Sequence, residues 1–452
     1  MQVDLSGRKA LVVGLGKSGI AAARLLTAKG ARVSIADQKS ESELADQLAQ
    51  LPDLHARHLG GIVSAAFDDI ELAVLSPGVP TKTQAIVDAR ARGVEIVGEV
   101  ELASRFIDEP LAGITGTNGK STTTALAGHL LTTAGKRVFT GGNLGNALSN
   151  RVLEGGARDV CVVELSSYQL ESIVGLRCAA ATVLNVTPDH LERHPTMDAY
   201  VAAKARIFEN QRAGDVAVLN AGDARVRTIA TPSGSVRQLF DPRGDSKVDG
   251  IVAKRTGARL IDVSGHTYSL TARTLRGDHN IENALAALLL ARHFDADPVA
   301  LQRGLDSYPG LPHRLEPVEI LDGVEWINDS KATNVDSVEK SLSAFPEGSR
   351  AVILILGGKG KGTPYAPLRE LMRTRVKSIL TIGQDAPRIA EELGDLAPLT
   401  ACGDLATACA RAQTIAKNGD VVLLSPACAS FDQFKSFEDR GDTFKRLVRG
   451  MR

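Results

Sequence analysis

The sequence predicts an α/β fold with three domains, each containing a mostly parallel β-sheet. Short apolar runs alternate with stretches of helical periodicity along the chain, which is the pattern of repeated βα units. Glycine-containing loops follow several of these runs, at residues 14–19, 116–119 and 357–362. The length of 452 residues is also that of about three domains. We expect the domain limits to be 1–98, 99–310 and 311–452.

Composition excludes several classes of protein. The 53 basic and 53 acidic residues balance, so no excess charge indicates nucleic-acid or membrane binding. The five cysteines are odd in number and include no CxxC pair, which predicts reduced thiols rather than disulfides or a zinc site. The first residues, MQVDLSGRKALVVG, lack the basic region and long apolar core of a signal peptide. We therefore expect a cytoplasmic protein with no membrane insertion and no nucleic-acid partner.

The first domain begins with a Rossmann-like βα unit. Residues 9–14 predict a strand, a helix extends to Lys29, and a second strand ends at Asp37. The glycine loop and the acid about 20 residues later match a dinucleotide fingerprint, for which NAD is the usual ligand. However, the unit is short for a dinucleotide domain and a second nucleotide loop follows closely, so a nucleoside diphosphate suits the site equally well. The candidate binding residues are Gly14, Leu15, Gly16, Lys17, Ser18, Asp37, Gln38, Lys39, Ser76, Pro77 and Gly78.

The central domain contains a second phosphate-binding pattern. An apolar strand ends at Thr115, a helix is expected from Thr122 onward, and Gly-Thr-Asn-Gly-Lys-Ser-Thr lies between them. Glycines let backbone N–H groups approach phosphate, the lysine reaches the outer phosphates and a hydroxyl holds Mg²⁺. The usual spacing requires glycine where this chain has Ile114, so the loop is a shorter variant. We expect a nucleotide at Gly116, Thr117, Asn118, Gly119, Lys120, Ser121 and Thr122.

Further polar residues follow strands of the same predicted sheet. Asn143, Glu164 and His190 each come after an apolar run, and ligands of open parallel sheets bind outside the carboxyl ends of the strands. Glu164 is a candidate ligand for Mg²⁺, with an ordinary strand-terminal acid as the alternative. His190 taken alone is as consistent with a structural histidine. Asn283, in a stretch that opens a helix, suits a base or ribose.

The C-terminal domain is predicted to be Rossmann-like as well, with four apolar strands followed by polar loops. These loops contain Lys331, Thr333, Lys359, Lys361 and Ser430. Lysines and hydroxyls at strand ends suit a small acidic substrate, although a charge at a loop tip is often only solvated.

Taken together, these motifs resemble the Mur ligases, the ATP-dependent amide-forming enzymes of peptidoglycan precursor synthesis. The family-wide stretches are GTNGKST, ELSSYQLE, NVTPDHLERH, AAKARIF, GDHNIENA and LPHRLE. INDSKATN and LLSPACASFDQFKSFEDRG resemble the glutamate-adding members, and the Asp-Asn-Pro-Arg of diaminopimelate-adding members is absent. The resemblance implies ATP, two Mg²⁺ ions, UDP-MurNAc-L-Ala and D-glutamate as ligands of a monomer that forms its amide through an acyl phosphate.

The resemblance also implies roles for individual residues. Lys120, His190 and Lys204 would be catalytic, with Lys204 carbamylated. The first domain would bind the UDP-substrate. Beyond the loop itself, ATP would contact Asn143, Asn283, Arg314 and Asp329. Metal would be held by Ser121, Glu164, His190 and the Lys204 carbamate. Glutamate would contact Lys331, Thr333, Lys361 (or Lys359), Ser430, Phe431 and Phe437.

Three alternatives remain open at this point. A dinucleotide-dependent oxidoreductase explains the loop at Gly14 but leaves that at Lys120 without a role. A nucleotide-sensing protein keeps the second loop but needs no amino-acid site. A relative that adds a different amino acid, such as L-glutamate, shares most of the motifs.

Overall fold

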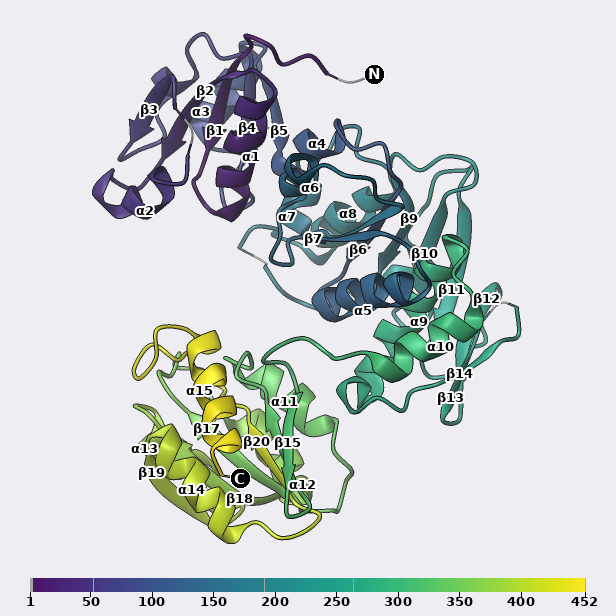
Figure 1. Ribbon diagram of the computed structural model, residues 1–452, viewed down its shortest axis with the longest axis vertical. Helices are drawn as coiled ribbons and strands as arrows, with labels where there is room; N and C mark the ends of the chain where they lie inside the picture. The colour runs from purple at the N-terminus through teal and green to yellow at the C-terminus, as the bar shows by residue number, and fades with distance from the viewer. Residues whose placement is uncertain (1–2, 52, 191, 263, 452) are drawn as a thin grey trace. The chain divides into compact units, whose positions relative to one another are not determined.

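The computed structural model describes residues 3–51, 53–190, 192–262 and 264–451, and it confirms the predicted α/β class (Figure 1). Within these residues the strands form three sheets of five, nine and six strands, and most neighbouring strands are parallel. Leu191, in the NVTPDHLERH stretch, lies outside the described residues. No helix in the described part of the chain has the length and apolar character needed to span a bilayer.

The first sheet is wholly parallel, in the order β3-β2-β1-β4-β5. The order reverses between β1 and β4, and the loops after these two strands meet there. Alternate residues of β1 face two separate cores, Ala10 and Val12 one and Leu11 and Val13 the other, so the sheet is covered on both faces. The elements are β1 Lys9–Val13, α1 Lys17–Ala28, β2 Arg32–Asp37, α2 Ala45–Leu48, β3 Ala56–Leu59, β4 Leu72–Leu75, α3 Gln84–Ala91, β5 Glu95–Gly98 and α4 Glu99–Ser104.

The second sheet has the order β14-β13-β12-β11-β10-β9-β6-β8-β7 and becomes antiparallel only at β12, β13 and β14. Its central strands are buried along their whole length, as parallel strands covered on both faces must be. The elements are β6 Leu111–Thr115, α5 Lys120–Thr133, β7 Val138–Gly142, α6 Leu148–Glu154, β8 Val160–Glu164, α7 Ser167–Leu170, β9 Cys178–Val183, α8 Met197–Ala205, β10 Val216–Asn220, β11 Val236–Asp241, β12 Ile251–Thr256, β13 Arg259–Ile261, β14 Thr267–Ser269, α9 Asp278–His293 and α10 Pro298–Ser307.

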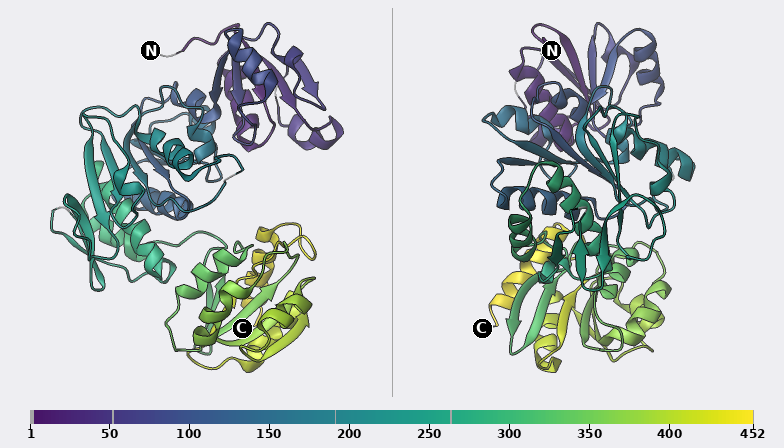
Figure 2. Two further views of the ribbon diagram at one scale, coloured as in Figure 1. Left: turned by 180° about the vertical axis from the view of Figure 1, so that it is seen from behind. Right: turned by 90° about the vertical axis from the view of Figure 1, so that its right-hand side faces the viewer.

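The third sheet has the order β15-β16-β20-β17-β18-β19, with only β15 antiparallel to its neighbour. Alternate residues of β17 again enter two cores, and Figure 2 shows helices on both sides of this sheet. The elements are β15 Glu316–Leu321, β16 Val324–Asn328, α11 Val335–Ser343, β17 Val352–Gly357, α12 Arg369–Arg375, β18 Val376–Ile382, α13 Ala386–Leu393, β19 Leu399–Gly403, α14 Leu405–Ile415, β20 Val421–Leu424 and α15 Phe437–Arg449.

Packing divides the chain into two compact units. The first unit contains the first and second sheets, in the residues up to Ser269 together with Ile281–Leu305. A continuous apolar core joins its two sheets, and α1 contacts both α4 and α6. The second unit contains the third sheet, in Leu270–Asn280 and the residues from Asp306. The domain limits expected at residues 98 and 310 stay predictions.

Some elements differ from the sequence prediction. Helix α5 begins at Lys120, two residues before the expected start, because Gly119 ends the loop. The prediction also omitted β3, β15 and β19. These three strands lie at sheet edges, and their residues are only partly buried, so they lack the apolar run on which the prediction depended.

Candidate active site

The loop after β6 has the geometry of a phosphate-binding turn. Gly119 is left-handed, with φ of +82°, immediately before α5 begins. A Cβ atom there would lie 2.2 Å from Oδ1 of Asn283, so both backbone conformation and space require glycine. Lys120, Ser121 and Thr122 form the first turn of α5, where backbone N–H groups and the helix dipole favour an anion.

Two lysine ammonium groups meet at the carbonyl oxygen of Gly116. Nζ of Lys120 donates to this oxygen at 3.0 Å and Nζ of Lys204 donates to it at 2.8 Å. Lys204 comes from α8 and is 1% exposed, with its ammonium 4.3 Å from the ring centroid of Tyr200. Burial, and then the charge of Lys120, lower the pKa of Lys204 to about 7, against the opposing charge of Asp189. A substantial fraction of this buried amine is therefore neutral near pH 7.

Glu164 ends β8 with a carboxylate that is only half satisfied. Its side chain is buried, and Oε1 accepts a hydrogen bond of 2.7 Å from Nδ2 of Asn143. Its Oε2 has no hydrogen-bond partner among the residues that the structure describes. A buried acceptor of this kind needs a partner, and a carboxylate oxygen is the type of ligand that Mg²⁺ prefers. The residue thus fits a cation at the carboxyl end of β8.

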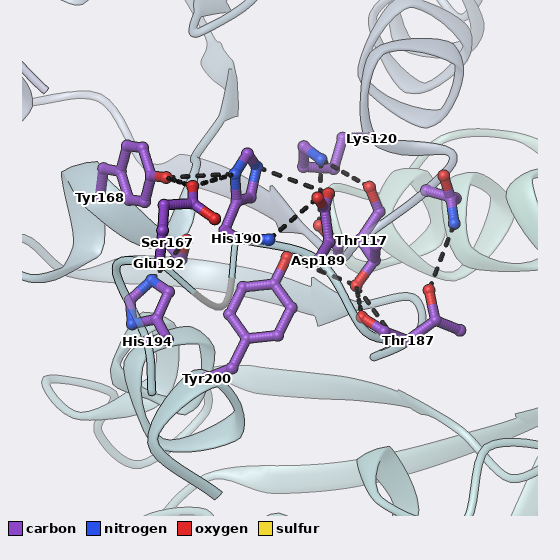
Figure 3. A network of polar contacts seen from close by, with 12 residues as sticks. Thr117, Lys120, Ser167, Tyr168, Thr187, Asp189, His190, Glu192, His194 and Tyr200 are labelled. Atoms are coloured by element: carbon purple, nitrogen blue, oxygen red, sulfur yellow. Dashed lines mark hydrogen bonds and ion pairs between the residues drawn. The ribbon is translucent and has the colours of Figure 1, made fainter. Parts of the chain in front are cut away.

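His190 follows β9 in a network of polar contacts, with its two ring nitrogens facing different neighbours (Figure 3). Nδ1 lies 3.1 Å from Oη of Tyr168, which donates to Oε1 of Glu192 at 3.2 Å. Nε2 lies 3.5 Å from Oδ2 of Asp189. Since the Glu192 carboxylate only accepts, the tyrosine proton points to it and the tyrosine oxygen accepts from Nδ1–H of the histidine ring. Both ring nitrogens of His190 therefore have a polar neighbour.

His194, from the same stretch of sequence, has a different setting. It is buried, and its Nε2 lies 3.0 Å from Oγ of Ser167. Burial lowers its pKa, which favours the neutral ring. This histidine is consistent with a structural role.

A cavity of about 670 Å³ lies at the point where the strand order of the first sheet reverses. All eleven candidate residues of the first domain line it: Gly14, Leu15, Gly16, Lys17, Ser18, Asp37, Gln38, Lys39, Ser76, Pro77 and Gly78. The lining also includes Asn143 of the second sheet, the same residue that donates to Glu164. A residue of the cavity lining thus donates to the carboxylate at the end of β8, the strand that pairs with β6.

Asp37 supports the walls of this cavity. Its Oδ2 accepts from the backbone N–H of Leu15 at 2.7 Å, and its Oδ1 accepts from that of Lys39 at 2.9 Å. Gly19 allows α1 to approach closely, since a Cβ atom there would lie 1.9 Å from O of Gly14. The fingerprint residues thus shape the loop in addition to lining the cavity.

Sequence reasoning missed several lining residues. Leu44, Gln47 and Ile62 contribute from the segment between β2 and β4. Gly142, at the end of β7, contributes together with Gly145 and Ala147 from the segment after it. Leu44, Gln47 and Ile62 do not follow a predicted strand directly, so the strand-end rule had no means of finding them. Gly142, Gly145 and Ala147 flank Asn143, which the rule did find, but they carry no polar side chain that would mark them.

In the second unit, Asp329 is buried and internally bonded. Its Oδ2 accepts from Oγ of Ser341 at 2.6 Å and Oγ of Ser425 at 2.7 Å, and Oδ1 accepts from N–H of Leu315 at 3.2 Å. Burial raises the pKa of Asp329 to about 6 despite these bonds. The observed contacts are structural, whereas the contact with ATP expected of Asp329 and of exposed Arg314 stays a prediction.

The residues expected to bind glutamate also belong to the second unit. The ammonium of Lys331 lies 5.1 Å from the ring centroid of Phe437, and Phe431 is 69% exposed. Ser430 is buried, and its Oγ has no hydrogen-bond partner in the described part of the chain. Thr333 is half-buried.

The loop of residues 357–362, which contains Lys359 and Lys361, has one end beside Ser430. The backbone of Lys359 pairs with that of Ala429, and both Lys359 and Lys361 are exposed. The choice between Lys359 and Lys361 therefore stays open.

Arg440 was not singled out by sequence reasoning. It is fully buried, donates through Nε to Oγ of Ser330 at 2.9 Å, and donates through Nη2 to O of Ser330 at 2.8 Å. It also donates to O of Cys428 at 3.2 Å. One guanidinium thereby joins the loop that carries Lys331 to the loop that carries Ser430.

Comparison with known proteins identifies the family. The Mur ligase MurD-like N-terminal domain matches residues 8–98, the Mur ligase middle domain matches 114–291, and the Mur ligase glutamate ligase domain matches 313–428. A relative from Anaeromyxobacter dehalogenans is 52% identical over 457 residues, covering 98% of both chains. One from Myxococcus xanthus is 52% identical over 458 residues, covering 100% of both. The chain belongs to the Mur ligase family. Both relatives are named UDP-N-acetylmuramoylalanine–D-glutamate ligase.

A solved structure supports the fold of this Mur ligase. The UDP-N-acetylmuramate–alanine ligase of Thermotoga maritima matches with a TM-score of 0.60 and 19% identity, covering 98% of this chain and 100% of that chain. At this level of identity the likeness concerns the fold alone.

The described residues of this Mur ligase form no preformed metal cage. In the ranges that the structure describes, no group of three or more His, Cys, Asp and Glu residues could hold a metal ion. Glu164 offers its unpartnered oxygen, and a ring nitrogen of His190 is a further candidate ligand. The remaining ligands of a Mg²⁺ ion would have to come from a hydroxyl, water or bound phosphate, as is usual for this metal.

Proposed function

We propose that this Mur ligase adds D-glutamate to UDP-N-acetylmuramoyl-L-alanine, with conversion of ATP to ADP and phosphate. Relatives of that name at 52% identity over the full length support the assignment. One geometric observation carries it: Asn143 lines the first-sheet cavity and donates to Glu164, which belongs to the same sheet as the loop at Lys120. A UDP-substrate in the cavity and ATP at the loop would therefore share one neighbourhood.

The reaction begins with activation of a carboxylate, which is a poor electrophile on its own. An oxygen of the alanyl carboxylate attacks the γ-phosphorus of ATP, ADP leaves, and an acyl phosphate forms. Phosphoryl transfer depends mainly on positioning and on stabilisation of charge. Lys120 supplies positive charge beside the transferring group, and Asn143 orients the Glu164 carboxylate.

The amide then forms at the acyl carbon. The neutral amine of glutamate attacks this carbon, and the tetrahedral intermediate releases phosphate and a proton. Lys331, Thr333, Ser430, Phe431 and Phe437, with Lys359 or Lys361, bind the amino acid in this proposal. The buried Oγ of Ser430 that lacks a partner supports such a role.

Mg²⁺, when bound, would neutralise phosphate charge and polarise the oxygens between which the phosphoryl group moves. Ser121, Glu164 and His190 would hold the two ions expected for the family. The pKa of Lys204, lowered to about 7, supports a carbamate there, because only a neutral amine reacts with CO₂. The carbamate would convert a cation that repels a metal into an anion that attracts one.

The test is phosphate release by the full chain with ATP, Mg²⁺ and UDP-MurNAc-L-Ala, using D-glutamate, L-glutamate, L-lysine and diaminopimelate as separate acceptors. We expect release with D-glutamate and the matching amide product by mass spectrometry. A preference for any other acceptor would instead identify a relative that adds a different amino acid.

A further inference from the structure

Asn185, after β9, makes hydrogen bonds to the backbone of the ATP loop (residues 116–119). Its backbone oxygen accepts from N–H of Thr117 at 2.9 Å. Its side-chain Oδ1 accepts from N–H of Asn118 at 2.8 Å, and its Nδ2 donates to O of Asn118 at 3.3 Å. One residue therefore satisfies three backbone groups in the middle of the loop and decides its shape.

The side chain of Asn185 is itself held by Glu282 of helix α9. Nδ2 of Asn185 donates to Oε1 of Glu282 at 2.5 Å, which is the shorter of the two bonds that this nitrogen makes. The N–H of Asn118 needs an acceptor, so the amide oxygen of Asn185 faces Asn118, and Oε1 of Glu282 supplies the acceptor for the amide nitrogen on the other side. The two residues are 97 positions apart in sequence.

The next residue of α9 also acts on the loop. Oδ1 of Asn283 accepts from Oγ1 of Thr123 in α5 at 3.1 Å, and it fills the space above Gly119. Consecutive residues of α9 thus restrain both ends of the segment from Asn118 to Thr123. The ATP loop is anchored to α9 as well as to its own sheet.

A buried carboxyl group at position 282 has two costs. Burial, with a contribution from Asp223, raises the pKa of Glu282 to about 7. A negative charge near an anion-binding loop also opposes the binding of ATP. An apolar side chain would avoid both costs but would lack the oxygen that Asn185 needs.

We propose that Glu282 is a positioning residue for ATP binding, because its oxygen anchors Asn185 and thereby holds the ATP loop in the conformation that receives phosphate. This inference rests on the proposed ATP-dependent function. Glu282 need not touch the nucleotide for this role, since it acts through Asn185.

The test compares Glu282→Met with Glu282→Gln in the full chain. Methionine has a similar length and no acceptor oxygen, whereas glutamine keeps a carbonyl that can accept from Asn185. Calorimetry with MgATP alone measures affinity, and steady-state kinetics measure KM for ATP and for the UDP-substrate. Thermal unfolding reports on the fold, and Glu391→Met, at an exposed glutamate of α13, controls for the substitution itself.

We expect Glu282→Met to weaken MgATP binding and raise KM for ATP about tenfold, consistent with loss of one hydrogen bond in a buried network. Glu282→Gln should stay within about threefold of the wild type by both measures, since its carbonyl preserves that hydrogen bond. In Glu282→Met the KM for the UDP-substrate should not rise, and the unfolding temperature should not fall.

Three outcomes would overturn the inference: normal MgATP affinity in Glu282→Met, equal loss in both variants, or a general loss of stability and of UDP-substrate binding. A wild-type protein that binds MgATP yet releases no phosphate with any acceptor would instead contradict the proposed function and leave the role of Glu282 intact.

Discussion

Lys120 and Lys204 direct their ammonium groups to the same atom, the carbonyl oxygen of Gly116, at 3.0 Å and 2.8 Å. The two cations come from different helices, and one oxygen cannot neutralise both. Their repulsion adds to burial in lowering the pKa of Lys204. The proposed function assigns the two lysines different roles, Lys120 as a cation for phosphate and Lys204 as an amine that is modified.

Replacement of Lys120 tests the first of these roles. We expect Lys120→Ala to lower turnover by about 10²–10³, because it removes a cation from the place where charge develops during phosphoryl transfer. The fold should be retained, which circular dichroism and thermal unfolding can check. Lys136→Ala, just beyond the other end of α5, serves as the matched control and should keep normal turnover. Steady-state ATP hydrolysis of Lys120→Ala within a few-fold of the wild type would contradict the assignment.

Replacement of Lys204 tests the second role. Enzyme depleted of bicarbonate should lose activity and regain it when bicarbonate is returned, and Lys204→Ala should lose most activity in both conditions. A direct measurement is available in ¹³C NMR, where protein labelled with ¹³C-bicarbonate should show a carbamate resonance that Lys204→Ala lacks. The resonance should persist in Lys136→Ala. Normal turnover of Lys204→Ala at limiting Mg²⁺ would exclude this lysine from the site.

The first-sheet cavity should discriminate between UDP-substrate and NAD. Calorimetry on the full chain should show binding of UDP-MurNAc-L-Ala and no heat with NADH. Lys17→Ala, at a cavity-lining lysine, should weaken binding of the UDP-substrate several-fold through loss of one charge-assisted contact, and Lys82→Ala, at an exposed lysine outside the lining, should not. If NADH displaced the UDP-substrate at a similar concentration, the cavity would have to be assigned to a dinucleotide instead.

Candidate site residues could be predicted from the sequence where they come directly after a strand. Glycine loops and strand ends predicted the eleven cavity residues from Gly14 to Gly78, and the same rule pointed to Asn143 and Glu164. These predictions need only local pattern and the fact that parallel strands end at one edge.

Contacts between distant segments could not be predicted in this way. The bond between Asn185 and Glu282 and the guanidinium of Arg440 on Ser330 join residues about a hundred positions apart. Nothing in the local pattern marks Glu282 as an acceptor for one particular amide, because its sequence neighbours only predict a helix. Leu44 and Ile62 enter the cavity from a connecting segment whose path depends on packing.

Glu282 also predicts a pH dependence of stability. Its folded-state pKa of about 7 lies above the ordinary value of 4.5, chiefly because of burial, with Asp223 raising it further and Asn185 and Asn220 lowering it. For an acid whose pKa is raised on folding, the folded state binds the proton more tightly than the unfolded state. The contribution of this proton to the free energy of unfolding is therefore complete below pH 4.5 and is lost as pH rises through 7.

Glu282→Gln should remove this loss, because glutamine stays neutral while keeping the hydrogen bond to Asn185. We expect the two proteins to be most similar in unfolding temperature near pH 5. The variant should gain on the wild type as pH rises to 8.5, by up to about 3 kcal/mol in free energy of unfolding. Thermal unfolding without nucleotide, at matched ionic strength, measures the difference, and taking the difference cancels titrations common to both proteins, including those of Lys204 and Asp329. A difference that stays constant from pH 5 to 8.5 would mean that the Glu282 carboxyl titrates alike in the folded and unfolded chains, so that its burial has no consequence for its charge.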